Sequence, residues 1–87
     1  ASLHFTLGNL YGEQSRWAEA QLAYFNAFRL DPTNALLSFS LATSLDHLGQ
    51  GKLAAQYYQQ ALQLDTSGNS GFDRTATQQR LSKLSAP

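Results

Sequence analysis

The chain has 87 residues, enough for one small domain, and 43% of them are hydrophobic. Six Lys and Arg balance six Asp and Glu, so no net field attracts nucleic acid or an anionic membrane. The absence of Cys excludes a disulfide framework and a thiolate metal site.

The first predicted helix pair covers residues 2–30. Over residues 2–14 the apolar residues recur at spacings of three and four, so one helix face carries Leu3, Leu7, Leu10 and Tyr11. Ser15 and Arg16 form the turn. A second helix is predicted over residues 18–30, and its apolar face carries Ala20, Tyr24, Ala27, Phe28 and Leu30. Asp31-Pro32 ends this helix, because proline cannot continue the helical hydrogen-bond ladder.

A second helix pair is predicted over residues 36–64, on the same plan. Its first helix, residues 36–48, presents Leu37, Leu41, Leu45 and Leu48. Residues 49–51 turn the chain, and the helix over residues 53–64 presents Ala54, Tyr58, Ala61 and Leu62. After a flexible break at residues 66–71, a polar helix is predicted over residues 72–84, with an apolar side of Phe72, Ala76, Leu81 and Leu84. We expect this last helix to cap the exposed end of the structure.

The two helix pairs are copies of one 34-residue pattern. Superposing residues 1–34 on residues 35–68 pairs Leu7 with Leu41, Gly8 with Ala42, Ala20 with Ala54, Tyr24 with Tyr58 and Ala27 with Ala61. A period of this length with two helices per unit is typical of a stacked solenoid. The sequence therefore predicts one all-α domain: repeat 1 at residues 1–34, repeat 2 at residues 35–68, and a loop with a capping helix at residues 69–87.

Small residues recur where the helices of each repeat are expected to cross: Gly8, Ala20, Ala42 and Ala54. They let two helix backbones approach closely. Tyr24 and Tyr58 are then expected to fill the gap that remains between the helices.

These positions resemble the tetratricopeptide repeat. In repeat 1 the matching residues are Leu7-Gly8-Asn9, Tyr11, Ala20, Tyr24, Ala27 and Leu30-Asp31-Pro32. In repeat 2 they are Leu41, Ala42, Leu45, Gly49, Ala54, Tyr58, Ala61 and Leu64-Asp65. Repeat 2 departs from the family pattern at Ser38, Gly51 and Thr66. The resemblance implies a helix-turn-helix solenoid, whose concave groove is lined by the first helix of each repeat and holds an extended peptide or a partner helix.

Carried over position by position, the resemblance implies a groove formed by Phe5, Asn9, Gly12, Glu13, Phe39, Ser40, Thr43, Asp46, His47, Asp73, Arg74 and Thr77. Phe5 and Phe39 are equivalent and lie off the main apolar stripe. Two interpretations are open: each ring contacts an apolar side chain of a ligand, or it packs against a neighbouring helix or against repeats outside this piece. Asn9 is available to bond a peptide carbonyl or amide.

One subgroup of the family grips a C-terminal carboxylate through Lys, Asn and Arg residues at set groove positions. Here those positions hold Phe5, Asn9, Ser40, Ser70 and Arg74. Because both lysines are missing, we expect no such clamp in this chain.

A second interface is predicted on the outer face of residues 18–30, where Leu22, Phe25 and Arg29 lie. Repeat 2 has glutamine at the three equivalent positions. Since polar residues are expected at sites that face water, the apolar pair indicates a contact surface, such as a homodimer interface or a contact with a preceding segment. The alternative is two scattered surface hydrophobes.

No catalytic, metal or cofactor site is predicted. His4 and His47 are isolated and lack the further ligands that zinc needs. Asp46 and His47 are neighbours on a helix, so their side chains point about 100° apart and form no dyad. The turn at residues 49–51 lacks the third glycine and the preceding strand of a dinucleotide site. Basic residues lie on different faces, so nucleic acid is not an expected partner.

The chain contains no Met and begins inside repeat 1, so we expect it to be a piece of a longer polypeptide. No apolar run is long enough to span a membrane and no signal-peptide pattern is present, so we expect this piece to make no direct membrane contact. A narrower resemblance is to bacterial repeat proteins of pilus biogenesis and secretion machinery, and it is carried by residues 44–50, 53–62, 72–74 and 79–81. In a bacterium the compartment would be the cytoplasm or the periplasm.

The leading hypothesis is a non-enzymatic protein-interaction module that binds a peptide or helix of a partner in its concave groove. The alternative is a structural role: a self-associating scaffold segment, or the C-terminal cap of a longer solenoid. In that case the apolar surfaces would meet other parts of the same assembly.

Overall fold

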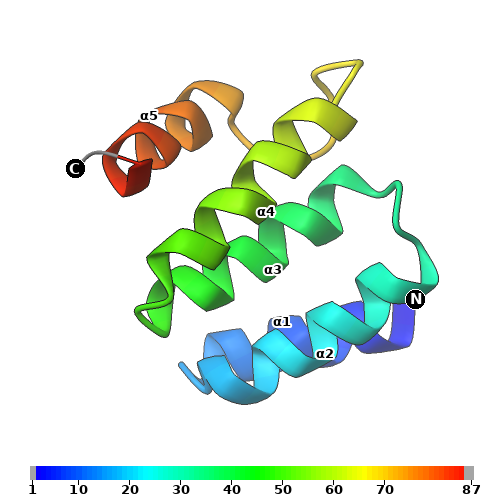
Figure 1. The fold of residues 1–87 in the computed structure, drawn as a ribbon. Coiled ribbons are helices and arrows are strands. Elements are labelled where there is room, and N and C mark those ends of the chain that lie inside the picture. Colours follow the sequence, from blue (N-terminus) through cyan, green and yellow to red (C-terminus); the bar gives the residue numbers. More distant parts are fainter. Residues whose placement is uncertain (1, 86–87) are drawn as a thin grey trace.

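The computed structural model describes residues 2–85, which form five α-helices and contain no β-strand. The helices are α1 (Ser2–Glu13), α2 (Trp17–Leu30), α3 (Ala35–His47), α4 (Gly51–Leu64) and α5 (Arg74–Ser85). The prediction of an all-α fold is confirmed. Each helix packs against the next one in the chain. Figure 1 shows α1 and α2 as one layer, α3 and α4 as the next, and α5 at the far end.

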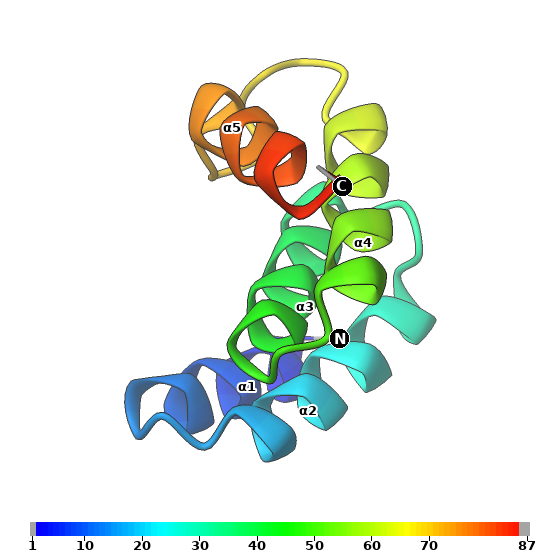
Figure 2. The same cartoon turned by 60° about the vertical axis from the view of Figure 1, so that its left-hand side comes forward.

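The two layers run in different directions. In the rotated view of Figure 2, the α1–α2 pair runs across the α3–α4 pair rather than along it. The residues between α2 and α3 form a hydrogen-bonded turn. Asn34 caps α3, because its side-chain oxygen accepts a hydrogen bond from the N–H of Leu37 at 3.2 Å. The amide of Asn34 also donates to Asp31 at 3.1 Å, which holds the turn.

The turns inside the two pairs share one backbone geometry. The N–H of Arg16 donates to the carbonyl of Tyr11 at 2.9 Å, and the equivalent bond at the end of α3 is 3.0 Å long. Such a bond across six residues ends a helix in a Schellman motif, which needs a left-handed residue just before the donor. Ser15, with a φ of 58°, and Gly49, with a φ of 79°, are those residues.

The core lies where α2, α3 and α4 meet, and most of its fully enclosed positions are small. The hydrophobic residues with no exposed surface are Ala20, Ala27, Leu41, Ala42, Ala54 and Ala61. Because alanine adds only a methyl group, helices with alanine at a crossing approach closely. The positions expected to lie at crossings are therefore buried, as predicted.

Two serines of α3 are also fully enclosed. The hydroxyl of Ser38 donates to the carbonyl of Tyr57 in α4 at 2.8 Å, and that of Ser44 donates to the carbonyl of Ser40 at 3.3 Å. Within residues 2–85, no buried side-chain nitrogen or oxygen lacks a hydrogen-bond partner. The small Ser38 thus connects α3 to α4.

Of the apolar stripe predicted for the first helix, Tyr11 packs half-buried against the core, but the three leucines are exposed. Leu3 is 71% exposed, Leu7 37% and Leu10 48%, while Phe5, placed off that stripe, is half-buried against the core. The physical reason is that α1 packs mainly against α2, and among the described residues no helix covers its leucine side. At the ends of two other predicted stripes, Leu30 and Leu48 are exposed as well.

The last helix differs from its prediction in its start and in its buried side. α5 begins at Arg74, so Phe72 lies in the preceding loop, and Asp73 caps the helix by accepting from the N–H of Ala76 at 3.1 Å. Ala76 is exposed, whereas Thr77 is buried, and Leu81 and Leu84 pack against the core. The loop over residues 65–73 is longer than the one over residues 31–34, so α5 does not keep the 34-residue spacing from α3.

Candidate functional site

The site begins with a close contact between α1 and α2. Gly8 is buried, and a Cβ atom added there would lie 2.5 Å from Cε1 of Tyr24. The missing side chain therefore makes room for the tyrosine ring. The hydroxyl of Tyr24 then donates to Oδ1 of Asn9 at 2.5 Å. Burial raises the pKa of the Tyr24 hydroxyl above its usual range, and the nearby carboxylate of Glu13 raises this pKa further.

Tyr58 repeats this arrangement one layer further along the stack. Its hydroxyl donates to Oδ2 of Asp46 in α3 at 3.1 Å, and burial raises its pKa. The acceptor differs from that of Tyr24: Asn9 is equivalent to Thr43, and Asp46 is equivalent to Gly12. Each tyrosine thus anchors a second helix to the first helix of its own pair.

Between the two layers lies a hollow of about 450 Å³, here called the central hollow. Six of the twelve residues predicted for the groove line it, from α1 and α3: Asn9, Gly12, Glu13, Phe39, Ser40 and Thr43. Trp17 and Tyr24 of α2 complete the lining. The wall combines aromatic rings with amide and hydroxyl groups, and Glu13 supplies the one charge among the described residues that line it.

Trp17 forms one end of the central hollow and was not among the predicted site residues. Its ring stacks on His47 at the end of α3, with centroids 3.9 Å apart and planes 3° from parallel. The sequence places Trp17 directly after a turn. Because α2 crosses α3, Trp17 then comes to lie at the far end of α3. The apolar spacing of a single helix does not predict this crossing.

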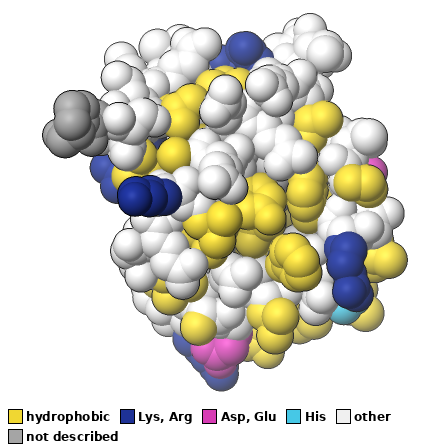
Figure 3. All heavy atoms as spheres, viewed as in Figure 1, with side chains coloured by type: hydrophobic (Ala, Val, Ile, Leu, Met, Phe, Trp, Pro, Cys, Tyr) yellow, Lys and Arg dark blue, Asp and Glu magenta, His cyan; other side chains and the backbone are white. Residues whose placement is uncertain are grey.

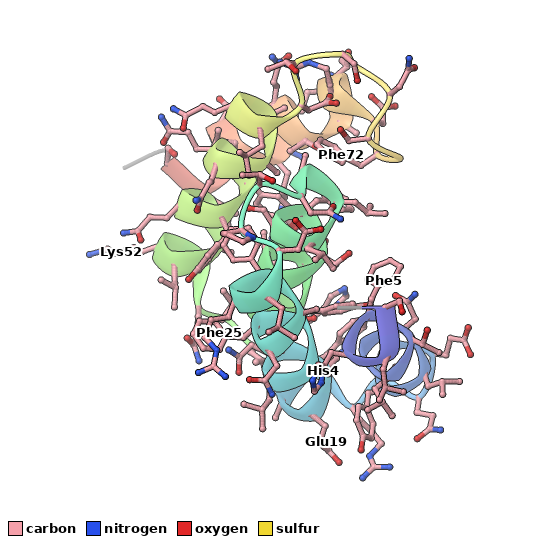
Figure 4. The ribbon with its side chains drawn as sticks, turned by 90° about the vertical axis from the view of Figure 1, so that its right-hand side faces the viewer. His4, Phe5, Glu19, Phe25, Lys52 and Phe72 are labelled. Atoms are coloured by element: carbon pink, nitrogen blue, oxygen red, sulfur yellow. The ribbon has the colours of Figure 1, made fainter. Side chains whose placement is uncertain are left out.

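The two phenylalanines of the predicted groove pack within the molecule. The ring of Phe5 lies 6.0 Å from that of Tyr24, and Phe39 lies 5.8 Å from Tyr58. Phe39 also stacks on Phe72, with centroids 4.8 Å apart and planes 2° from parallel. Figure 4 shows Phe5 and Phe72 on the same side of the molecule. Phe5 borders a separate hollow of about 240 Å³, whereas Phe39 borders the central hollow.

The remaining predicted groove residues lie toward α5. The guanidinium of Arg80 donates two hydrogen bonds of 2.6 Å to the carboxylate of Asp46. The bond from Arg80, helped by the one from Tyr58, holds the pKa of Asp46 below its usual range. Asp46 and His47 border an open hollow with Arg80, and Thr77, 3% exposed, donates its hydroxyl to the carbonyl of Asp73.

Ser70 and Arg74, at two positions of the carboxylate clamp, are both engaged with Asp65. Oδ1 of Asp65 accepts from the hydroxyl of Ser70 at 2.5 Å, and Oδ2 accepts from Arg74 at 3.1 Å. Arg74 also donates to the carbonyls of Leu62 and Asp65. The bond from Ser70, followed by that from Arg74, lowers the pKa of the buried Asp65 carboxyl. Both side chains thus hold the loop between α4 and α5 through these hydrogen bonds.

The predicted second interface lies on a different side of the molecule. Figure 4 shows Phe25 pointing away from the side that holds Phe5 and Phe72. Leu22 is 59% exposed, and Phe25 and Arg29 are exposed too. In Figure 3, hydrophobic side chains are exposed across the middle of the molecule, and charged ones lie mainly at the edges.

Within residues 2–85, no group of three or more His, Cys, Asp or Glu side chains is arranged to hold a metal ion. None of the described helices has the length and apolar character that crossing a membrane requires. No protein-family model matches the chain, and a comparison with curated proteins found no match. Any proposal about function therefore rests on the residues and contacts of the chain itself.

Proposed function

We propose that this chain is a non-enzymatic protein-interaction module of the tetratricopeptide type. It consists of two stacked helix pairs with α5 as the C-terminal cap, and it binds a peptide or helix of a partner protein. Equivalent residues with equivalent roles support the repeat assignment. Tyr24 and Tyr58 each bond the first helix of their own pair, and Ser15 and Gly49 each end that helix in the left-handed conformation.

The central hollow is the observation that carries the binding proposal. Residues from the first helix of each pair meet there, next to the two rings that α2 contributes. Aromatic rings beside amide and hydroxyl groups suit a peptide, which offers apolar side chains together with carbonyl and N–H groups. The single carboxylate of Glu13, with no cation in the described lining, favours a partner segment that carries Lys or Arg.

The proposed ligand is an internal segment rather than a chain terminus. A C-terminal carboxylate would need free cations, and Arg74 is already bonded to Asp65 and to two carbonyls. The resemblance of residues 44–50 and 53–62 to bacterial repeat proteins extends the proposal to a partner within a pilus or secretion assembly.

Peptides selected from a random display library on the immobilised chain test this function. Ser40→Arg places a long cationic side chain in the central hollow, and it changes a residue whose side chain is not in the core cluster. We expect it to weaken the selected peptides at least about tenfold, the scale of a lost contact residue in an interface. Circular dichroism checks that the variant keeps the helix content of the parent.

The matched control is Gln56→Arg, which adds the same side chain on the exposed side of α4. It should leave peptide affinity unchanged. Peptides that bind the Ser40→Arg variant as tightly as the parent would contradict binding in the central hollow. Phe39→Ala is a poorer test, because it also removes the stack on Phe72.

A further inference from the structure

The ring of Phe72 covers Phe39, which lines the central hollow. The two rings are stacked, with centroids 4.8 Å apart and planes 2° from parallel. Phe5, the equivalent of Phe39 in the first pair, makes a similar tilted contact with the tyrosine of its own pair. Among the described residues no ring is stacked on Phe5, and it borders a hollow of about 240 Å³ instead. In the second pair the equivalent ring is therefore covered by a side chain of the chain itself.

Phe72 belongs to a short stretch that no hydrogen bond holds. The loop is bonded at Ser70, whose N–H and hydroxyl both donate to Asp65. It is bonded again at Asp73, whose side chain caps α5. Between these two points, none of the residues that the structure describes forms a hydrogen bond with the backbone of Gly71 or Phe72. The ring can therefore leave its stack by rotating about its own side-chain bonds, with the hydrogen bonds of the loop intact.

The start of α5 does not depend on the Phe72 ring. Arg74 ties this end of the helix to the end of α4, because it donates to the side chain and to the carbonyl of Asp65. A ring just before a helix cap often packs against the residue four positions after the cap, which here is Thr77. Thr77 is polar, and its hydroxyl donates to the carbonyl of Asp73. α5 therefore keeps its cap and its link to α4 when the ring moves.

The place over Phe39 suits an aromatic side chain of a partner. Phe39 lines the central hollow and also a second hollow of about 250 Å³ toward α5. A stacked aromatic pair contributes a factor of about two to ten to an equilibrium, beyond the area that it buries. A partner ring on Phe39 replaces one such pair by another, whereas an aliphatic side chain does not. The stack in the free chain and the stack in a complex thus exclude each other.

We propose that Phe72 is an autoinhibitory strap, which stacks on Phe39 in the free chain and is displaced by an aromatic side chain of the bound partner segment. The inference rests on the proposed function for the identity of the partner as a peptide or helix. A site that is covered part of the time binds more weakly, in proportion to the fraction that is uncovered. Phe72 therefore lowers the affinity for aromatic segments and disfavours segments that bring no ring.

The test uses N-acetyl-phenylalanine methylamide, a small probe that carries an aromatic ring between two peptide groups. Binding is followed by the NMR chemical shifts of the Phe39 ring, and circular dichroism checks the helix content of each variant. Phe72→Ala removes the strap and should lower the dissociation constant of the probe by about two- to tenfold. Thr66→Ala, the matched control, shortens an exposed side chain of the same loop and should leave this constant unchanged.

The parent chain gives a second readout that needs no variant. Through-space NMR cross-peaks between the rings of Phe39 and Phe72 should be present in the free chain and should weaken as the probe is added. N-acetyl-leucine methylamide, which brings no aromatic ring, should leave these cross-peaks in place at the same concentration.

Two outcomes would overturn the strap. The first is a probe that binds Phe72→Ala no more tightly than the parent, or binds neither, which would make the Phe72 ring a fixed part of the fold. The second is a set of ring cross-peaks that persists at the highest probe concentration. The proposed function fails separately. Selected peptides that bind as tightly after Ser40→Arg would contradict binding in the central hollow and would leave the probe results unchanged.

Discussion

Arg80 in α5 and Asp46 in α3 are held together by two hydrogen bonds of 2.6 Å across 34 residues of sequence. The bond lowers the pKa of Asp46 from its usual 3.8. On acidification the unfolded chain therefore takes up this proton before the folded one does. The stabilisation of the fold by the charged Asp46 carboxylate is complete above the usual pKa of Asp46. It is lost as the pH falls through the pKa of Asp46 in the folded state.

Arg80→Gln should lower the urea midpoint slightly near neutral pH, because Arg80 is half-exposed and its ion pair is screened. It should also reduce the loss of stability between about pH 5 and about pH 3, since Asp46 then titrates nearer its usual value. Urea unfolding across this range measures both effects. Lys83→Gln removes a charge from an exposed position of the same helix and should keep the parent's acid profile. An Arg80→Gln profile parallel to the parent's would argue against the ion pair.

Asp65 holds the loop that leads into α5 through its hydrogen bonds. Removing its charge should loosen that loop more than the rest of the fold. Asp65→Asn keeps the shape of the side chain but removes the charge that accepts from Ser70 and Arg74. We expect faster amide exchange at residues 66–73 and in α5, with α2 and α3 little changed. Uniformly faster exchange through all helices would show that Asp65 supports the whole fold rather than the loop.

Gly8 should not tolerate even a methyl group. A Cβ atom there would lie 2.5 Å from the Tyr24 ring, so Gly8→Ala should lower the free energy of unfolding by about 1–3 kcal/mol. The gain in helix propensity, about 1 kcal/mol, is too small to offset the clash. The double variant with Gly8→Ala and Tyr24→Leu should lose less free energy of unfolding than the two single variants together. Tyr24→Leu removes the ring with which the new methyl group would clash. Strict additivity in urea unfolding would contradict this account.

The helices were predictable because their apolar spacing and their turn residues agree. Asp31-Pro32 and the turn at residues 49–51 place helix ends close to where the structure has them. Six of the eight residues that line the central hollow were predicted for the groove. Asn9 and Ser40 follow from the repeat register, but Trp17 enters through the crossing of α2 and α3, which no local period encodes.

The sequence predicted the wrong packing for two helices, α1 and α5, and each error has its own physical reason. The leucine stripe of α1 has the pattern of a buried face, but burial depends on a neighbouring helix that residues 2–85 do not supply. The apolar side predicted for the last helix included Ala76. The loop over residues 65–73 is longer than the one over residues 31–34, so Thr77 rather than Ala76 faces the core.

The equivalent turns at Ser15 and Gly49 yield a reciprocal prediction. Both residues are left-handed, with φ values of 58° and 79°, and glycine adopts that conformation without steric cost. Ser15→Gly should therefore raise the free energy of unfolding by up to about 1 kcal/mol, the penalty of a left-handed residue less the added chain entropy. Gly49→Ser should lower it by a similar amount.

The second change isolates the backbone, because a Cβ atom at position 49 would meet no other atom within 4 Å. Any loss of stability in Gly49→Ser is therefore conformational rather than a clash. Urea unfolding of the two variants and of their combination measures the effects, which should add because the turns lie in different layers. A stabilising Gly49→Ser, or a destabilising Ser15→Gly, would mean that the left-handed turns do not end α1 and α3 in solution.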